Sequence, residues 1–96
     1  MKQMEVTALG ELLIDFTENG ISAQGNPLLE ANPGGAPCNV LAMLAKLGHS
    51  TAFIGKVGAD MFGRRLRQVV ADAGIDITGL VEDSKVNTTL AFVHTL

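Results

Sequence analysis

Apolar and polar positions along the chain follow two periods, one typical of buried strands and the other of amphipathic helices. Residues 4–14 are mostly apolar and partly β-branched, which predicts a strand, or a strand with a bend near Gly10. Residues 15–35 contain several glycines and prolines and show neither period. The pattern therefore predicts a first strand followed by a long irregular segment.

Two amphipathic helices are predicted further along the chain. Residues 37–48 carry apolar side chains at helical spacing, begin with a proline and end with a glycine. Residues 60–74 repeat this pattern, and Asp60 is placed to cap the first turn. Strands are expected at residues 50–58, 74–84 and 87–96.

This alternation of strands and helices is typical of an α/β fold with a parallel sheet and crossover helices. The final apolar run reaches residue 96 without a turn or a polar tail. A sheet that ends in this way has an uncovered edge, which complete proteins normally avoid. We therefore expect a truncated chain that forms one part of a larger domain.

Composition narrows the possible functions. The 96 residues allow one domain, and seven basic against ten acidic residues give a net charge of −3, which argues against nucleic acid as a partner. Acidic residues interrupt the apolar start, and no later run has the length of a membrane span, so no membrane association is expected. The single cysteine, Cys38, fits a reducing compartment, and a cytoplasmic location is predicted.

Residues 32–40 carry the strongest sign of chemistry and read NPGGAPCNV. Gly34 and Gly35 allow the backbone to approach a ligand closely, and the helix start that follows supplies unpaired N–H groups. Asn39 adds a donor and an acceptor, a combination suited to a hydroxyl. The structural alternative, a loop with a glycine pair and a helix cap, explains the same pattern about equally well.

Asp15 follows the apolar part of the first predicted strand, where open α/β sheets place their ligands. An ionised carboxylate there can accept hydrogen bonds from two neighbouring hydroxyls of a polyol. The alternative is a solvated residue at the start of a turn.

Other motifs give weaker signals. The segment around residues 50–57 lacks the glycine and hydroxyl residue of a phosphate-binding loop, and no dinucleotide-binding fingerprint occurs. Cys38 lies in a first helical turn, which could lower its pKa, although a small packing residue is the simpler interpretation. His49 and His94 have no metal-ligand spacing with Cys38, so no metal site is predicted.

The order of the motifs GELLIDF, NPGGAPCNV, AKLGHSTAFIGKVGADMFG, GIDITGLV and TTLAFV resembles the N-terminal part of the ribokinase-like (pfkB) carbohydrate kinase family, and most closely bacterial fructokinases. The resemblance implies a three-layer α/β/α, Rossmann-like fold with a small β lid. Residues 1–96 would form its N-terminal segment, with lid segments near 15–33 and 86–96. A homodimer contact through the lid is also implied.

The resemblance further implies an ATP-dependent kinase that converts fructose to fructose 6-phosphate, with Asp15, Gly34, Gly35 and Asn39 binding the sugar. It places the catalytic residue and the sites for ATP and Mg²⁺ in the missing part of the protein, and a monovalent cation is possible. The fructokinase form of the motif, GGAPxNV, favours fructose over ribose. Alternatives are a related kinase acting on 2-keto-3-deoxygluconate, ribose or a nucleoside, and a non-catalytic α/β binding module.

Overall fold

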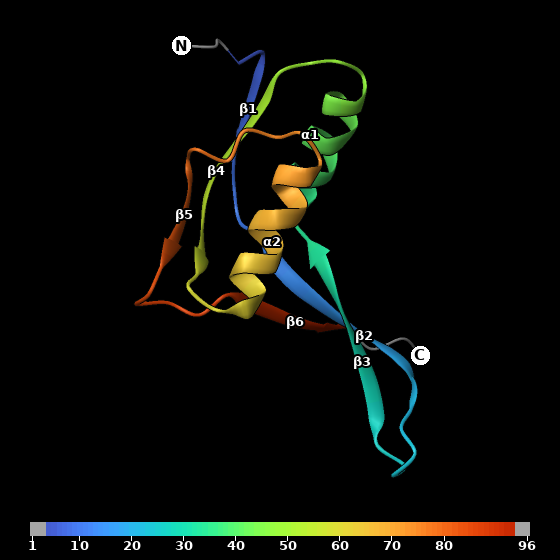
Figure 1. Cartoon of the computed structure of the whole chain (residues 1–96). Helices are drawn as coiled ribbons and strands as arrows, with labels where there is room; N and C mark the ends of the chain where they lie inside the picture. Colours follow the sequence, from blue (N-terminus) through green and yellow to red (C-terminus); the bar gives the residue numbers. More distant parts are fainter. Residues whose placement is uncertain (1–3, 94–96) are drawn as a thin grey trace.

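The computed structural model describes residues 4–93, which form two three-stranded sheets and two helices (Figure 1). The core sheet has the order β1-β4-β5 and is parallel throughout, whereas the second sheet has the order β3-β2-β6. In chain order the elements are β1 (Val6–Leu9), β2 (Leu13–Ile21), β3 (Pro27–Gly34), α1 (Ala36–Lys46), β4 (Thr51–Gly58), α2 (Met61–Asp72), β5 (Leu80–Asp83) and β6 (Thr89–Val93).

Strand β4 is the centre of the core sheet, and both helices cover the same face of it (Figure 1). Phe53 and Val57 are buried beneath the helices, while Ile54 and Lys56, which alternate with them, are exposed on the opposite face. The described residues thus supply the sheet and one helical layer. The predicted α/β fold with a parallel sheet is confirmed.

The two helices begin for different physical reasons. Gly35 precedes α1 and makes no side-chain cap, and a proline in the first turn needs no amide partner. Helix α2 has a side-chain cap, because Asp60 Oδ1 accepts a hydrogen bond of 2.7 Å from Gly63 N. The predicted cap is confirmed, and neither described helix has the length and apolarity to cross a bilayer.

The hydrophobic core lies between the core sheet and the helices and reaches the base of the second sheet. Phe53 and Ile14 are fully buried, at 0% exposure. Burial of each such large apolar side chain stabilises the fold by about 1.5–3 kcal/mol. The remaining members are Leu12, Leu41, Val57, Leu66, Val70, Ile75 and Leu80.

The second sheet extends away from the core sheet and is anchored by its inner end (Figure 1). Ile14 and Phe16 of β2 point toward the core, and the Phe16 ring stacks on Phe92 at 5.2 Å and meets Phe62 of α2 edge-on at 5.6 Å. By contrast, six of the eight residues of β3 are exposed. Packing therefore fixes the base of this sheet, while backbone pairing holds its outer part.

The local pattern was wrong about residues 15–35. Instead of an irregular segment, they continue β2 and then form β3, which pairs with it antiparallel. Residues 4–14 form two strands in different sheets, separated by a break at residues 10–12 that begins at the predicted bend. The last predicted strand is β6, which joins the second sheet; residues 94–96 of that prediction lie outside the described residues.

Candidate functional site

Asp15 lies near the base of the second sheet, on the central strand β2. It is paired with Asn32 on β3 and with Ala91 on β6. Its side chain is partly exposed, and within residues 4–93 no hydrogen bond to its carboxylate is found. A carboxylate in this state can accept hydrogen bonds from a ligand without first breaking internal ones.

Gly34 and Gly35 are required by two different close contacts. A side-chain carbon at position 34 would collide with Asp15 Oδ2, so the carboxylate lies directly against the Gly34 backbone. Gly35 has φ +128°, and a side-chain carbon there would lie 2.8 Å from the carbonyl oxygen of Glu11. The glycine pair thus brings the backbone against Asp15 and then turns the chain into α1.

Asn39 follows this turn on the first turns of α1, and its side chain is exposed. The backbone N–H groups of Cys38 and Asn39 both lie near Gly35 O, at 3.1 and 3.4 Å. The first turn carries no acidic residue, so the partial positive charge of the helix start is not neutralised locally. Because these two N–H groups donate to Gly35 O and Pro37 has none, this end of α1 offers mainly the exposed carboxamide of Asn39 to an oxygen-rich ligand.

A small cleft of about 80 Å³ borders the glycine pair and Asn39 but does not include Asp15. Its other lining residues are mainly apolar and come from Leu12, α1, α2 and Ile75. A cleft of this size with a mainly apolar lining offers few polar partners to a sugar. The surface beside Asp15 is the better candidate for a polar ligand.

The glycine pair links the predicted site residues. Asp15 contacts Gly34 directly, and Asn39 lines the same small cleft as Gly34 and Gly35. No hydrogen bond joins Asp15 to Asn39 in residues 4–93. The arrangement leaves both side chains available to an added ligand, and their role in binding stays a prediction.

Sequence reasoning missed two residues next to Asp15. The side-chain amide of Asn32 donates to Thr17 Oγ1 at 2.9 Å and to the backbone oxygen of Asp15 at 3.3 Å. These contacts depend on the register between β2 and β3, which was not visible in a segment expected to be irregular. Strict alternation of Asp15 and Thr17 around Phe16 was the available signal.

Cys38 does not behave as a nucleophile. Burial raises the pKa of its thiol to about 11, so the thiol stays protonated at neutral pH despite its place in the first helical turn. Its side chain packs against the hydrophobic core. Packing is therefore the role of Cys38, and the alternative of a lowered pKa is wrong.

Asp60 connects the core to the second sheet. Besides capping α2, its Oδ1 accepts a hydrogen bond of 2.7 Å from Thr88 Oγ1, and its Oδ2 accepts one of 2.9 Å from Thr88 N. Thr88 Oγ1 also accepts from Gly58 N at 3.1 Å. The hydrogen bonds from the Thr88 and Gly63 backbone amides lower the pKa of Asp60. This network fixes the start of β6 against α2 and β4.

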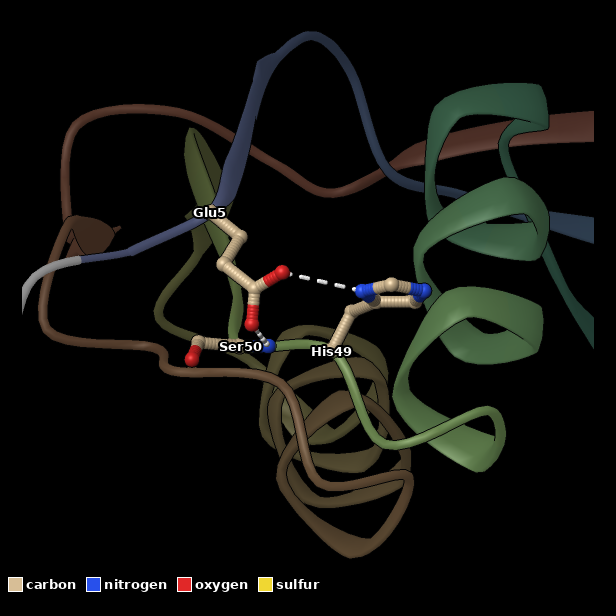
Figure 2. Close-up of polar contacts among 3 residues, drawn as sticks. All are labelled: Glu5, His49 and Ser50. Atoms are coloured by element: carbon tan, nitrogen blue, oxygen red, sulfur yellow. Dashed lines mark hydrogen bonds and ion pairs between the residues drawn. The ribbon is translucent and has the colours of Figure 1, made fainter.

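A second polar group lies at the amino-terminal end of the core sheet, away from Asp15. Figure 2 shows the Glu5 carboxylate bound to His49 Nδ1 at 2.9 Å and to the backbone N–H of Ser50 at 3.3 Å. These bonds, the one to His49 first, lower the pKa of Glu5. They join the residues that precede β1 and β4.

No group of His, Cys, Asp and Glu side chains within residues 4–93 could hold a metal ion.

The family model for pfkB family carbohydrate kinases matches residues 3–96 of the chain. The chain belongs to the pfkB family of carbohydrate kinases. Its ribokinase-like fold agrees with this membership, since solved sugar kinases of the family share the arrangement of the described residues. The expected family and fold are confirmed.

Several relatives are fructokinases. Fructokinase-1 of Oryza sativa subsp. japonica is 47% identical over 90 residues, which are 92% of this chain and 28% of that protein. Xylella fastidiosa fructokinase has a TM-score of 0.85 and 38% identity over 93% of this chain and 28% of its own, and it has also been solved with bound ATP. Aminoimidazole riboside kinase of Salmonella enterica has a TM-score of 0.79 and 34% identity, over 92% of this chain and 28% of its own. The chain spans little more than a quarter of these proteins.

Proposed function

We propose that the full-length protein is an ATP-dependent carbohydrate kinase that phosphorylates fructose to fructose 6-phosphate. Membership of the pfkB family and identities of 40–47% to fructokinases support this activity. The observation that carries the sugar-binding part is the Asp15 carboxylate, which is partly exposed, free of hydrogen bonds within residues 4–93, and pressed against Gly34.

Asp15 and Asn39 have complementary roles in this proposal. The carboxylate accepts hydrogen bonds from two sugar hydroxyls, while the carboxamide of Asn39 can donate to one hydroxyl oxygen and accept from another hydroxyl. Gly34 lets the Asp15 carboxylate lie against the backbone, and Gly35 makes the turn that brings α1 and Asn39 next to it. The sugar would lie between the second sheet and the start of α1.

The second sheet acts as the lid over the sugar in this proposal. A lid that excludes water protects the phosphoryl group from hydrolysis during transfer. The exposed apolar side chain of Ile21, at 73% exposure, together with the open edges of β3 and β6, supports a homodimer contact through this sheet.

The chemical step itself would depend on other parts of the protein. Phosphoryl transfer needs a base for the attacking hydroxyl and charge around the transferred group, and Mg²⁺ supplies part of that charge when bound with ATP. Residues 4–93 contain no acidic cluster that fits Mg²⁺. The free thiol of Cys38 supports the proposed cytoplasmic location.

A second candidate is a kinase of the same fold with a different acceptor. The similarity to Salmonella enterica aminoimidazole riboside kinase, solved with aminoimidazole riboside and an ATP analogue, favours a riboside among the alternatives. Ribose and 2-keto-3-deoxygluconate belong in the same panel of acceptors. A non-catalytic binding module is the remaining alternative.

Calorimetry and a coupled assay of ADP release on the full-length protein test the proposal, with fructose, ribose, 2-keto-3-deoxygluconate and a riboside as acceptors. Asp15→Asn should weaken fructose binding about a hundredfold or more, because it removes charge from two hydrogen bonds. Asp72→Asn, the same change at the exposed end of α2, should leave binding unchanged. Wild-type protein that binds none of these compounds, or an Asp15→Asn variant with unchanged affinity, would contradict it.

A further inference from the structure

The second sheet has one apolar face and one polar face. Residues paired in register point to the same side of a sheet. Ile14 and Phe16 face the core, so Asp15 and Thr17 face the other way. We call this side of the second sheet the polar face. Its polar residues are Asp15 and Thr17 on β2, Glu30 and Asn32 on β3, and Thr89 on β6, and its apolar residues are Leu13 beside Thr89, Ala91 beside Asp15 and Val93 beside Thr17.

The neighbour of Asp15 on β6 is small, because its partner Ala91 has only a methyl group. The place over Gly34 is occupied by the Asp15 carboxylate itself and by the Leu13 side chain. On the side toward the hairpin end the neighbours on β2 and β3 are polar, because Asn32 lies opposite Asp15 and Thr17 follows two residues later, whereas β6 places Val93 beside Thr17. A ligand held by Asp15 therefore meets Thr17 and Asn32 if it extends along β2.

The hydrogen bonds of Asn32 determine how its amide is oriented. Nδ2 lies 3.3 Å from Asp15 O and 3.2 Å from Glu30 O, and both are backbone carbonyls that can only accept. The nitrogen must therefore face them, which leaves Asn32 Oδ1 as an acceptor that takes no hydrogen bond from residues 4–93. The orientation of this carboxamide follows from chemistry alone.

The same bonds prepare the Thr17 hydroxyl as a donor. Thr17 Oγ1 accepts a hydrogen bond of 2.9 Å from Asn32 Nδ2, and its own proton has no acceptor within the described part of the chain. Thr17 can thus donate while Asn32 Oδ1 accepts. A hydroxyl group, which both accepts and donates, is the ligand group that satisfies the two at once.

We propose that Thr17 and Asn32 form a second hydroxyl-binding pair, which binds the acceptor sugar at a point distant from the group held by Asp15. The inference rests on the proposed kinase function and narrows its substrate. Two residues along a strand span about 7 Å, so the ligand must carry hydroxyls separated by about that distance. A six-carbon sugar such as fructose reaches both points, whereas a three-carbon polyol is too short.

The test uses the full-length protein and measures affinity by calorimetry for fructose and for its single-deoxy analogues. Thr17→Val keeps the shape and β-branching of the side chain but removes its hydroxyl, and should weaken fructose binding about five- to tenfold with kcat little changed. Thr17→Ser should stay within twofold of wild type. Thr7→Val, on β1 of the core sheet, is the matched control and should have no effect.

A double-mutant cycle that combines Thr17→Val with each deoxy analogue identifies the fructose hydroxyl that Thr17 binds. For one deoxy analogue the wild type should lose affinity while Thr17→Val loses nothing more, because the partner of that hydroxyl is already gone. Additive losses for every analogue, or a Thr17→Val affinity within twofold of wild type, would overturn the inference. If the Thr17 results overturned the inference but Asp15→Asn still abolished fructose binding, the proposed kinase function would stand. Wild-type protein with no affinity for sugar would contradict both the inference and the proposed function.

Discussion

The core sheet and the second sheet are built from the same chain but are stabilised in different ways. In the core sheet, β4 buries Phe53 and Val57 under two helices. In the second sheet, β3 is exposed along most of its length, and only the base of β2 packs against the core. Segments with little apolar burial open at a lower free energy than core strands. We therefore expect the core sheet to be the more rigid of the two and the second sheet to open more easily.

The site lies where these two regions meet. Asp15 belongs to the second sheet, Asn39 to a helix of the core, and Gly34 and Gly35 join them. A movement of the second sheet would thus change the distance between the two proposed sugar-binding side chains. Substitutions in each region, and at their junction, test this division.

The largest difference in the free energy of unfolding is expected between alanine substitutions at two phenylalanines. Phe53→Ala leaves a cavity at a fully buried position and should lower the free energy of unfolding by about 3–5 kcal/mol. Phe92→Ala, at a position 70% exposed, removes mainly the stacking on Phe16 and should lower it by about 1 kcal/mol. Denaturant unfolding of the full-length variants measures both changes. Equal losses would contradict the division into a tightly packed and a loosely packed sheet.

The next largest loss of stability is expected where α2 meets the end of β4 and the start of β6. Gly63 is buried in the first turn of α2, and a side-chain carbon there would collide with the carbonyl oxygen of Gly58 and lie 3.0 Å from Thr88 Oγ1. Gly63→Ala should therefore lower the free energy of unfolding by about 3 kcal/mol, since backbone must shift to make room.

Gly48→Ala separates crowding from backbone strain. Gly48 has φ +91° with nothing within 4 Å, so alanine there suffers only the left-handed conformation, about 1–2 kcal/mol. If Gly63→Ala destabilised the protein no more than Gly48→Ala does, the close contact between α2 and the ends of β4 and β6 would not hold in solution.

The core elements could be predicted from sequence because their signals are local. Residues 37–48 and 60–74 have helical spacing of apolar residues and clear ends, and the helices form at Ala36–Lys46 and Met61–Asp72. The outer parts of β2 and β3 are exposed on both faces, so their sequence shows no alternation that would indicate strands. Their structure depends on pairing between distant residues, and only the family resemblance pointed to it.

The residues of the candidate site also differ in whether a local sequence signal reveals them. Asp15 was recognisable because it follows an apolar run, and Gly34 and Gly35 because they are adjacent and directly precede a helix. Thr17 and Asn32 were not, since their relation to Asp15 depends on the register of the hairpin. The cap formed by Asp60 was predicted from local spacing, whereas its bonds to Thr88, 28 residues away, were beyond a local pattern.

The smallest effect separates the two functions of Asp60. Asn also caps helices well, so in Asp60→Asn one oxygen can still accept from Gly63 N. The amide nitrogen that replaces Oδ2 would then face the N–H of Thr88, where two donors oppose each other. Asp60→Asn should lower stability by about 1 kcal/mol at pH 7. It should also raise amide hydrogen exchange in β6 while α2 stays protected.

The pH dependence gives an independent check of the same contact. The folded-state pKa of Asp60 lies below its unfolded value, so the ionised carboxylate contributes stability above the unfolded pKa, and this contribution is lost as the pH falls through the folded pKa. Wild type should therefore approach the stability of Asp60→Asn as the pH falls below about 4. Thr88→Val keeps the backbone donor but loses the hydroxyl. In this background, Asp60→Asn should lower the free energy of unfolding at pH 7 by less than it does in the wild type. A difference between wild type and Asp60→Asn that stayed constant from pH 7 to pH 3 would show that this carboxylate does not tie the second sheet to the core.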